Sequence, residues 1–304
     1  MKIPTTRRGF LGAAGLAGLG AAAAPTASAR IEATPWGIRL GIATYTLRNF
    51  ERAHTIEMIG QVRTPWISVK NTPQQLATDS TPEQARAARR AFDDAGLKVT
   101  SIGNIDMTHG ATVDDLRPLF ELARNFGAPM MVCAPTRENL KAVERLVREY
   151  DIRIAIHNHG PEDRHFPSAQ SVLDAVSALD ARCGLCMDVG HAYRAVRTAH
   201  LSESDAARRG DTVYADDPVN AITLSGARLF DMHIKDLTDL TGKDSQCDVG
   251  DGEMPIPAIF RALKKIRYAG CVNLEYEING GNPMPGVQRS FSYMRGVLAG
   301  LAAA

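Results

Sequence analysis

The segment Phe230-Asp-Met-His-Ile-Lys-Asp236 predicts a buried strand that ends in polar residues. Side chains alternate between the two faces of a strand. Met232 and Ile234 therefore share one face, while His233 and Lys235 share the other. We expect the first face to pack on an apolar layer. The second face would turn an imidazole and an ammonium group toward a polar space.

Three other segments repeat this pattern and also carry metal-type side chains where the strand gives way to a loop. They are Ile154-Ala-Ile-His-Asn-His159, Leu185-Cys-Met-Asp-Val-Gly-His191 and Val272-Asn-Leu-Glu-Tyr-Glu277. Alternation places imidazoles and carboxylates on one face of each strand, namely His157 and His159, Asp188, and Glu275 and Glu277. The sequence therefore predicts that four strands direct these groups into a common space.

From Ile38 onward, short apolar strands alternate with amphipathic helical segments, which is typical of βαβ units and a parallel sheet. The expected strands are Arg39–Thr46, Trp66–Lys70, Lys98–Ile105, Pro129–Ala134, Arg153–His157, Cys183–Asp188, Leu229–Lys235 and Cys271–Glu277. The expected helices are His54–Val62, Thr81–Ala95, Val113–Asn125, Arg137–Tyr150, Ser168–Leu179, Pro218–Ser225, Ile256–Ile266 and Val287–Leu301.

Eight strands and about eight helices in roughly 265 residues predict an α/β fold of the (β/α)₈ TIM-barrel type. A doubly wound open sheet is the alternative. Such a sheet usually carries a glycine-rich dinucleotide loop after its first strand, and Thr44-Tyr-Thr-Leu-Arg-Asn-Phe50 is not such a loop. We expect one TIM-barrel catalytic domain over residues 30–304.

Residues 1–29 have the pattern of a twin-arginine signal peptide. Thr6-Arg-Arg-Gly-Phe-Leu11 is followed by an apolar run from Leu11 to Ala24 and by the small-residue cleavage pattern Ala27-Ser-Ala29. The run of about 14 residues is shorter than the ~20 needed to span a membrane. We therefore expect export and cleavage, with a mature protein that is periplasmic or secreted and holds no membrane segment.

Charge and cysteine content exclude several other classes of protein. A net charge of +1 and a pI near 7.7 give no reason to expect nucleic acid as a partner. The five cysteines are too few and too scattered for a disulfide framework. Cys183 and Cys186 lie three apart on one strand, so they face opposite ways and form no metal knuckle. No Gly-x-Ser-x-Gly elbow supports a serine nucleophile.

In a barrel the C-terminal ends of the strands meet at one mouth, which predicts a metal site. The expected ligands of one divalent ion are His157, Asp188, His233 and Glu275. Imidazoles and carboxylates without a thiolate suit Mn²⁺, Zn²⁺, Co²⁺ or Mg²⁺. Because His157 and His159 share a face, the sequence leaves open which of them is the ligand. Buried histidines held only by hydrogen bonds are the alternative for this pair.

Other polar residues at the mouth are candidates for catalysis and substrate binding. Glu275 and His157 are the candidate bases, and Lys70 at the end of the second strand is a candidate catalytic donor. The expected substrate-binding residues are Tyr45, His159, His191, Arg194 and Lys235. The alternative for Glu275 and Glu277 is a salt bridge with Lys235 or Lys70. Asp236 has the opposite parity to His233, so we expect it to support a loop.

Together these motifs resemble the sugar phosphate isomerase/epimerase family of xylose isomerase-like barrels, which also includes endonuclease IV-type enzymes. The resemblance is carried by Ile156-His-Asn-His-Gly160, Met187-Asp-Val-Gly-His191, Asp231-Met-His-Ile-Lys-Asp236, Val249-Gly-Asp-Gly252 and Leu274-Glu-Tyr-Glu277. It implies one divalent metal held at the ends of strands five to eight, with Asp188, His233 and Glu275 matching family ligands. His157 stands where the family often has glutamate.

The resemblance implies a metal-dependent sugar isomerase or epimerase that works through a metal-stabilised enediolate. The small-molecule substrate would be a carbohydrate or glycoside. Two alternatives remain open from the sequence. One is a metal-dependent lyase that cleaves 3-keto-glycosides by β-elimination, which the histidine at strand five and the export signal favour. The more distant one is a non-catalytic sugar-binding barrel. The identity of the sugar and the oligomeric state are not predicted.

Overall fold

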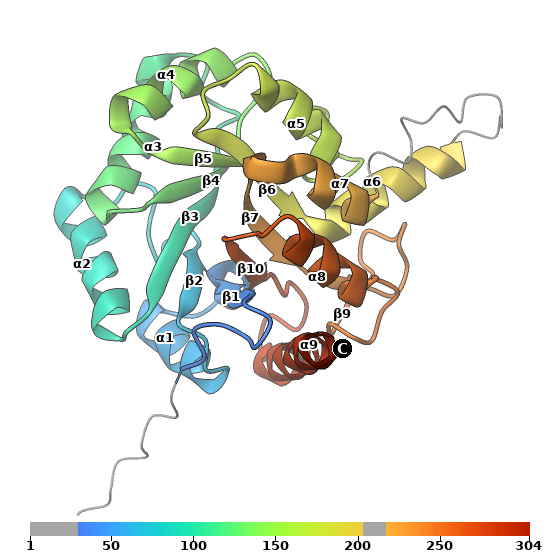
Figure 1. The fold of residues 1–304 in the computed structure, drawn as a ribbon. Helices are drawn as coiled ribbons and strands as arrows, with labels where there is room; N and C mark the ends of the chain where they lie inside the picture. Colours follow the sequence, from blue (N-terminus) through green and yellow to red (C-terminus); the bar gives the residue numbers. More distant parts are fainter. Residues whose placement is uncertain (1–29, 203–216) are drawn as a thin grey trace, which may run out of the picture.

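Eight parallel strands close into a barrel in a computed structural model that describes residues 30–202 and 217–304 (Figure 1). The order around the barrel is β1-β10-β7-β6-β5-β4-β3-β2. The strands are β1 (Arg39–Ala43), β2 (Trp66–Val69), β3 (Lys98–Asp106), β4 (Met130–Ala134), β5 (Arg153–His157), β6 (Cys183–Asp188), β7 (Leu229–Ile234) and β10 (Cys271–Leu274). The predicted TIM barrel is confirmed. The expected signal peptide, residues 1–29, lies outside the described residues.

Helices surround the barrel as an outer layer (Figure 1). Thr81, Thr112 and Ser168 each cap a helix through a reciprocal capping box, which satisfies backbone N–H groups that have no partner within the helix. The helices are α1 (Arg52–Gln61), α2 (Pro82–Asp94), α3 (Val113–Phe126), α4 (Leu140–Tyr150), α5 (Ala169–Ser177), α6 (Val189–Ser202), α7 (Pro218–Ser225), α8 (Ile256–Lys265) and α9 (Met284–Ala303). In the described part, no helix is both long enough and apolar enough to cross a membrane.

The first and last strands are shorter than predicted. β1 ends at Ala43 and continues as the 3-10 helix η1 (Thr44–Leu47), and β10 ends at Leu274. The Thr46 hydroxyl donates to the Leu274 carbonyl over 3.3 Å and accepts from the Tyr276 N–H over 2.9 Å. A side chain therefore replaces the next step of the β1–β10 ladder, which alternation along the sequence does not reveal.

Helix α6 and a small hairpin are further differences from the prediction. The segment after Asp188 was expected to leave the strand as a loop, but Val189 is the first residue of α6. Beyond β7, the two-residue strands β8 (Asp236–Leu237) and β9 (Gln246–Cys247) pair in antiparallel fashion. Asp236 holds the following loop, because its carboxylate accepts from the backbone N–H groups of Gly250 and Met254 at 2.9 and 3.0 Å. The expected role of Asp236 as a loop partner is confirmed.

Strand alternation separates two buried layers. Ile156, Met187 and Ile234 belong to the large apolar cluster between the barrel and its helices. A second, smaller cluster contains Cys186 together with Met130, Val132, Ala155 and Phe230. Cys183 lies in the large cluster and Cys186 in the small one, so they face opposite ways as predicted. Polar residues on the same face of the strand as Cys186 therefore point into the barrel and can line its mouth.

Tight packing between β1 and β10 gives a stability prediction at Gly41. A Cβ at this position would overlap the side chains of Asn273 and Cys271 and lie 3.0 Å from the Trp66 carbonyl oxygen. We expect Gly41→Ala to lower the free energy of unfolding by ~1–3 kcal/mol, because the buried strand has no room for a methyl group. Gly60→Ala is the matched control. It lies in α1 with no atom within 4 Å of the added Cβ, and should stabilise the protein by up to ~1 kcal/mol. Urea unfolding measures both, and equal stabilities would contradict the prediction.

Candidate functional site

Four predicted metal ligands converge at the C-terminal mouth of the barrel. His157 ends β5, Asp188 ends β6, His233 lies near the end of β7, and Glu275 follows β10. One ligand atom from each lies within 4.8 Å of all the others. His157 Nε2 is 3.1 Å from His233 Nδ1 and 3.7 Å from Asp188 Oδ2, and His233 Nδ1 is 3.2 Å from Glu275 Oε2. All four side chains are buried.

These separations fit a single divalent cation. Bonds of about 2.0–2.2 Å from a cation to nitrogen or oxygen place neighbouring ligand atoms roughly 3.0–3.6 Å apart. Two imidazole nitrogens that face each other at 3.1 Å also need a proton or a cation between them. Burial, reinforced by the His159 and His233 imidazoles, keeps the pKa of His157 well below its usual value, and a neutral imidazole is the form that binds metal.

Unsatisfied polar atoms also mark this cluster. Asp188 Oδ2 and His157 Nδ1 are buried and make no hydrogen bond of good geometry within residues 30–202 and 217–304, and the same holds for His233 Nε2. Buried polar atoms normally have a partner. The Lys235 ammonium lies 2.9 Å from Asp188 Oδ2, and a cation bound by the four residues would give this oxygen a second partner.

The structure separates His157 from His159, which the sequence left as alternative ligands. His157, rather than His159, belongs to the four-residue group. The His159 side chain is 31% exposed, and its Nδ1 lies 3.2 Å from Asp163 Oδ2. His159 Nε2 lies 2.7 Å from the Asn104 side-chain nitrogen. The Asp163 carboxylate therefore orients His159, which lies beside the four candidate ligands and is not one of them.

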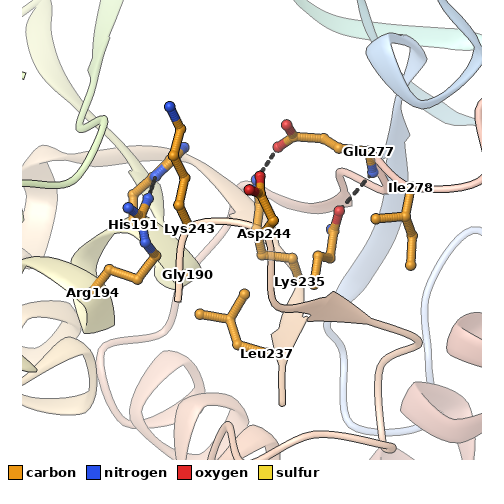
Figure 2. A pocket seen from close by; sticks show the side chains of 10 residues that line it. Gly190, His191, Arg194, Lys235, Leu237, Lys243, Asp244, Glu277 and Ile278 are labelled. Atoms are coloured by element: carbon orange, nitrogen blue, oxygen red, sulfur yellow. Dashed lines mark hydrogen bonds and ion pairs between the residues drawn. The ribbon is translucent and has the colours of Figure 1, made fainter. Parts of the chain in front are cut away.

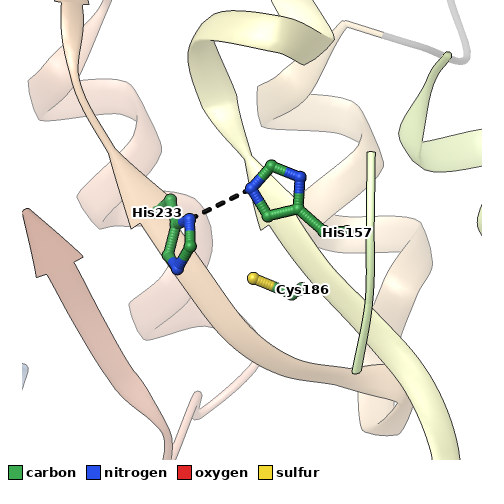
Figure 3. Close-up of side chains that lie close together, drawn as sticks. All are labelled: His157, Cys186 and His233. Atoms are coloured by element: carbon green, nitrogen blue, oxygen red, sulfur yellow. Dashed lines mark hydrogen bonds between the residues drawn. The ribbon is translucent and has the colours of Figure 1, made fainter. Parts of the chain in front are cut away.

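Cys186 lies close to His157 and His233, two of the candidate ligands (Figure 3). One atom each of His157, Cys186 and His233 also lie within 4.8 Å of one another. Burial raises the pKa of the Cys186 thiol to about 12, so the sulfur is protonated at neutral pH and is a poor ligand in that form. Cys186 shares the strand parity of Asp188, which places it beneath the site, and it packs in the smaller buried cluster.

Lys235 inserts an ammonium group among the carboxylates of the mouth. Its Nζ lies 2.9 Å from Asp188 Oδ2 and 3.1 Å from Glu275 Oε2, and it also pairs with Glu277. Burial disfavours the ammonium form, but the three carboxylates raise the pKa of Lys235 well above its usual value. The sequence left open whether Glu275 and Glu277 pair with Lys235 or with Lys70. In the structure both carboxylates pair with Lys235. Its acceptors include two of the candidate ligands.

Asn158 and His191 fix the position of Asp188. The Asn158 side chain accepts from the Asp188 N–H over 2.9 Å and donates to the Asp188 carbonyl over 3.0 Å. The backbone N–H of His191, in the first turn of α6, donates to Asp188 Oδ1 over 2.9 Å. Burial lowers the pKa of His191 to about 4, so its imidazole is neutral at physiological pH.

A polar cavity of about 220 Å³ opens above the candidate ligands. Lys70 donates from Nζ to the Asn104 carbonyl over 2.5 Å and lies 5.3 Å from the centre of the Tyr45 ring. Burial lowers the pKa of Lys70, against the opposing effect of Glu275 and Asp106. The cavity is lined by Tyr45, Lys70, Asn104, His157, His159, His191, Glu275 and Glu277. Arg194 and Lys235, also predicted to bind substrate, line a neighbouring cavity instead.

A polar network that the sequence analysis missed lies deeper in the barrel. Asp231 is buried, and its carboxylate accepts from the Ser101 hydroxyl and from the Asn273 side-chain amide, each over 2.8 Å. Burial raises the pKa of Asp231, against the effects of its neighbours. Asp231 has the same strand parity as His233, which predicts that it points into the barrel. Its partners could not be predicted, because they lie on strands far away in the sequence.

A closed parallel barrel with imidazoles and carboxylates gathered at its C-terminal mouth defines a TIM-barrel protein with the donor set of a metal site. The chain belongs to the xylose isomerase-like TIM barrel family, whose model matches residues 66–297. No curated protein sequence matches the chain.

Solved structures at low sequence identity share the fold. The 3-keto-D-glucoside 4-epimerase of E. coli is 13% identical with a TM-score of 0.63, over 85% of this chain and 99% of that chain. A D-psicose 3-epimerase is 15% identical with a TM-score of 0.58, over 86% and 97%. A xylose isomerase domain protein of Alicyclobacillus acidocaldarius is 15% identical with a TM-score of 0.66, over 88% and 100%.

Proposed function

We propose that the protein is a divalent-metal-dependent sugar isomerase or epimerase. The observation that carries the proposal is the convergence of His157, Asp188, His233 and Glu275 beneath a polar cavity. Family membership supports it, because structures that share this fold include a 3-keto-D-glucoside 4-epimerase and a D-psicose 3-epimerase. The specificity for sugar phosphates that the family resemblance suggested is not part of this proposal.

The four residues would hold Mn²⁺, Zn²⁺, Co²⁺ or Mg²⁺, all of which accept nitrogen and oxygen ligands. Such an ion, when bound, polarises the carbonyl and hydroxyl oxygens of a sugar and makes the neighbouring C–H more acidic. Asn158 and the His191 backbone maintain the orientation of Asp188 for this purpose. Partners of this kind around a ligand are typically worth 10–100-fold in metal affinity, an order-of-magnitude estimate.

Glu275 is the proposed base that takes a proton from carbon. Burial alone would raise its pKa, but His233 and Lys235 hold the pKa well below the usual value, so the carboxylate is ionised. Oε2 faces His233 and Lys235, and Oε1 is the oxygen we assign to the proton transfer. Lys70 and His159 line other parts of the same cavity. They would donate to sugar oxygens or return the proton.

Elimination is the second candidate, favoured by the histidine at the end of β5. In this reaction the base takes the proton at C2 of a 3-keto-glycoside. The C–H electron pair forms the C1–C2 double bond, the C1–O bond breaks, and the departing oxygen takes up a proton. His159, paired with Asp163, is the residue we assign to that last step.

We also propose that the protein acts outside the cytoplasm. The support is the twin-arginine pattern Thr6-Arg-Arg-Gly-Phe-Leu11 with its apolar run and small-residue cleavage pattern. An exported enzyme meets sugars and glycosides more readily than sugar phosphates, which favours an uncharged substrate. Fractionation of the producing cells tests this location, and a cytoplasmic product of full length would overturn it.

The function is tested with Mn²⁺-loaded protein, methyl 3-keto-β-D-glucoside and D-fructose in D₂O. An isomerase or epimerase is expected to introduce deuterium at a carbon beside the carbonyl, which NMR detects. A lyase releases methanol from the glycoside. A binding barrel does neither, and that result would overturn an enzymatic role. Mn²⁺ without protein provides the background rate.

A further inference from the structure

We infer that the natural substrate has two parts: a sugar that lies over the four candidate ligands, and a second, ring-sized group that lies in a neighbouring cavity. The inference rests on the proposed function and names its substrate class, a glycoside with an aryl or glycosyl substituent. It is carried by the position, the size and the lining of the second cavity, and none of these depends on the metal.

Figure 2 shows the side chains that line the second cavity, and two of them also line the first. His191 and Glu277 line both cavities, and Glu277 pairs with Lys235, which lines the second. A ligand that reaches across His191 and Glu277 would therefore occupy both spaces without moving any strand of the barrel. Glu277 is further held by its backbone, which donates to Gln246 over 2.8 Å.

The sizes of the two cavities indicate one ring in each. They have volumes of about 210 and 220 Å³. Each is smaller than the roughly 300–1,000 Å³ usual for sites that enclose a drug-sized ligand. A single sugar fills the first cavity and leaves the second to another group, so the pair together matches a two-ring ligand.

The lining of the second cavity differs in character from that of the first. Leu237 and Ile278 provide apolar contact, whereas the first cavity is lined almost entirely by polar side chains. Lys243, Asp244 and Gln246 supply polar groups beside them. An apolar surface with polar groups around it is the arrangement that packs on one face of a ring and binds hydroxyls at its edge.

Arg194 places a largely buried guanidinium in the wall of this cavity. The residue is 4% exposed and lines the cavity. Its guanidinium pairs with Glu162, but its Nε has no hydrogen-bond partner in the part of the chain that the structure describes. Arg194 therefore adds a charged group to the polar part of the lining.

Equilibrium binding tests the inference without any turnover. Isothermal titration calorimetry would measure Kd for methyl β-D-glucoside, phenyl β-D-glucoside and cellobiose with Mn²⁺-loaded protein. We expect phenyl glucoside or cellobiose to bind about 10–100-fold more tightly than the methyl glucoside, because the second ring is buried in the second cavity. If only phenyl glucoside binds more tightly, the natural substrate is an aryl glycoside. If only cellobiose binds more tightly, it is a disaccharide.

Two tryptophan variants locate the effect. Ile278→Trp fills the second cavity and should bring the ratio of Kd values to about one. Ile266→Trp is the matched control, because Ile266 is equally half-buried but lines a different cavity, and it should keep the wild-type ratio. Ile278→Ala, which removes apolar contact without adding bulk, should also reduce the ratio and serves if the tryptophan variant does not fold.

Equal Kd values for the three glycosides in the wild type would overturn the inference, as would an unchanged ratio in both Ile278 variants. These outcomes are separate from a failure of the proposed function. That failure would appear as absence of deuterium exchange and of methanol release from the 3-keto-glucoside, whatever the binding data show.

Discussion

His233→Ala is expected to bind Mn²⁺ or Zn²⁺ at least about a hundredfold more weakly than the wild type, because even partners that only orient a ligand are worth 10–100-fold. His233 Nδ1 lies 3.1 Å from His157 Nε2 and 3.2 Å from Glu275 Oε2. Its removal takes away one of four ligand atoms and breaks the chain of contacts between the other three. Metal content after dialysis and competition with a chelating dye measure the effect.

His109→Ala is the control for this variant. The His109 side chain is 94% exposed and pairs only loosely with Asp106, over 3.5 Å. Its loss should leave metal content and Kd unchanged. Full metal occupancy in His233→Ala would show that the cation is held elsewhere, and the proposed metal centre would then be wrong.

Lys235→Met is expected to destabilise the metal-free protein by ~3–5 kcal/mol, the usual cost of removing one partner from a buried charged group. The ammonium of Lys235 contacts Asp188, Glu275 and Glu277. Without it, three carboxylates repel one another at the mouth. A bound dication would replace the lost positive charge, so Mn²⁺ should stabilise this variant more than it stabilises the wild type.

Urea unfolding in EDTA and in Mn²⁺ measures both parts of this prediction. Lys98→Met is the matched control, because Lys98 pairs with Glu32 over 2.6 Å at an exposed position. Exposed pairs contribute only ~0–1 kcal/mol, so this variant should remain close to the wild type with or without metal. If Lys235→Met were as stable in EDTA as the wild type, Lys235 would not be balancing the carboxylates.

Local alternation explains why so much of the mouth was predictable from the sequence. His157, Asp188 and His233 each lie at or near the end of a strand whose other face is apolar, so parity fixed their direction. The ends of the strands were harder to predict. The Thr46 contacts with Leu274 and Tyr276 join residues about 230 positions apart, and no local pattern encodes them.

Residues whose role depends on several strands at once were also missed. Asp231 is held by Ser101 and Asn273, 130 and 42 positions away, and Cys186 became a neighbour of the histidines only when β5, β6 and β7 were placed side by side. In the same way, the sequence predicted Lys235 and Arg194 as pocket residues but could not assign them to a second cavity. Such assignments require the closed barrel.

The mouth of the barrel divides its tasks between two arcs. The candidate ligands come from β5, β6, β7 and the segment after β10, whereas Tyr45, Lys70 and Asn104 come from the β1–β3 side. Substitutions on that side therefore leave the four candidate ligands in place. A protein engineer can thus alter how the first cavity holds a sugar from one arc, and the candidate metal centre or the second cavity from the other.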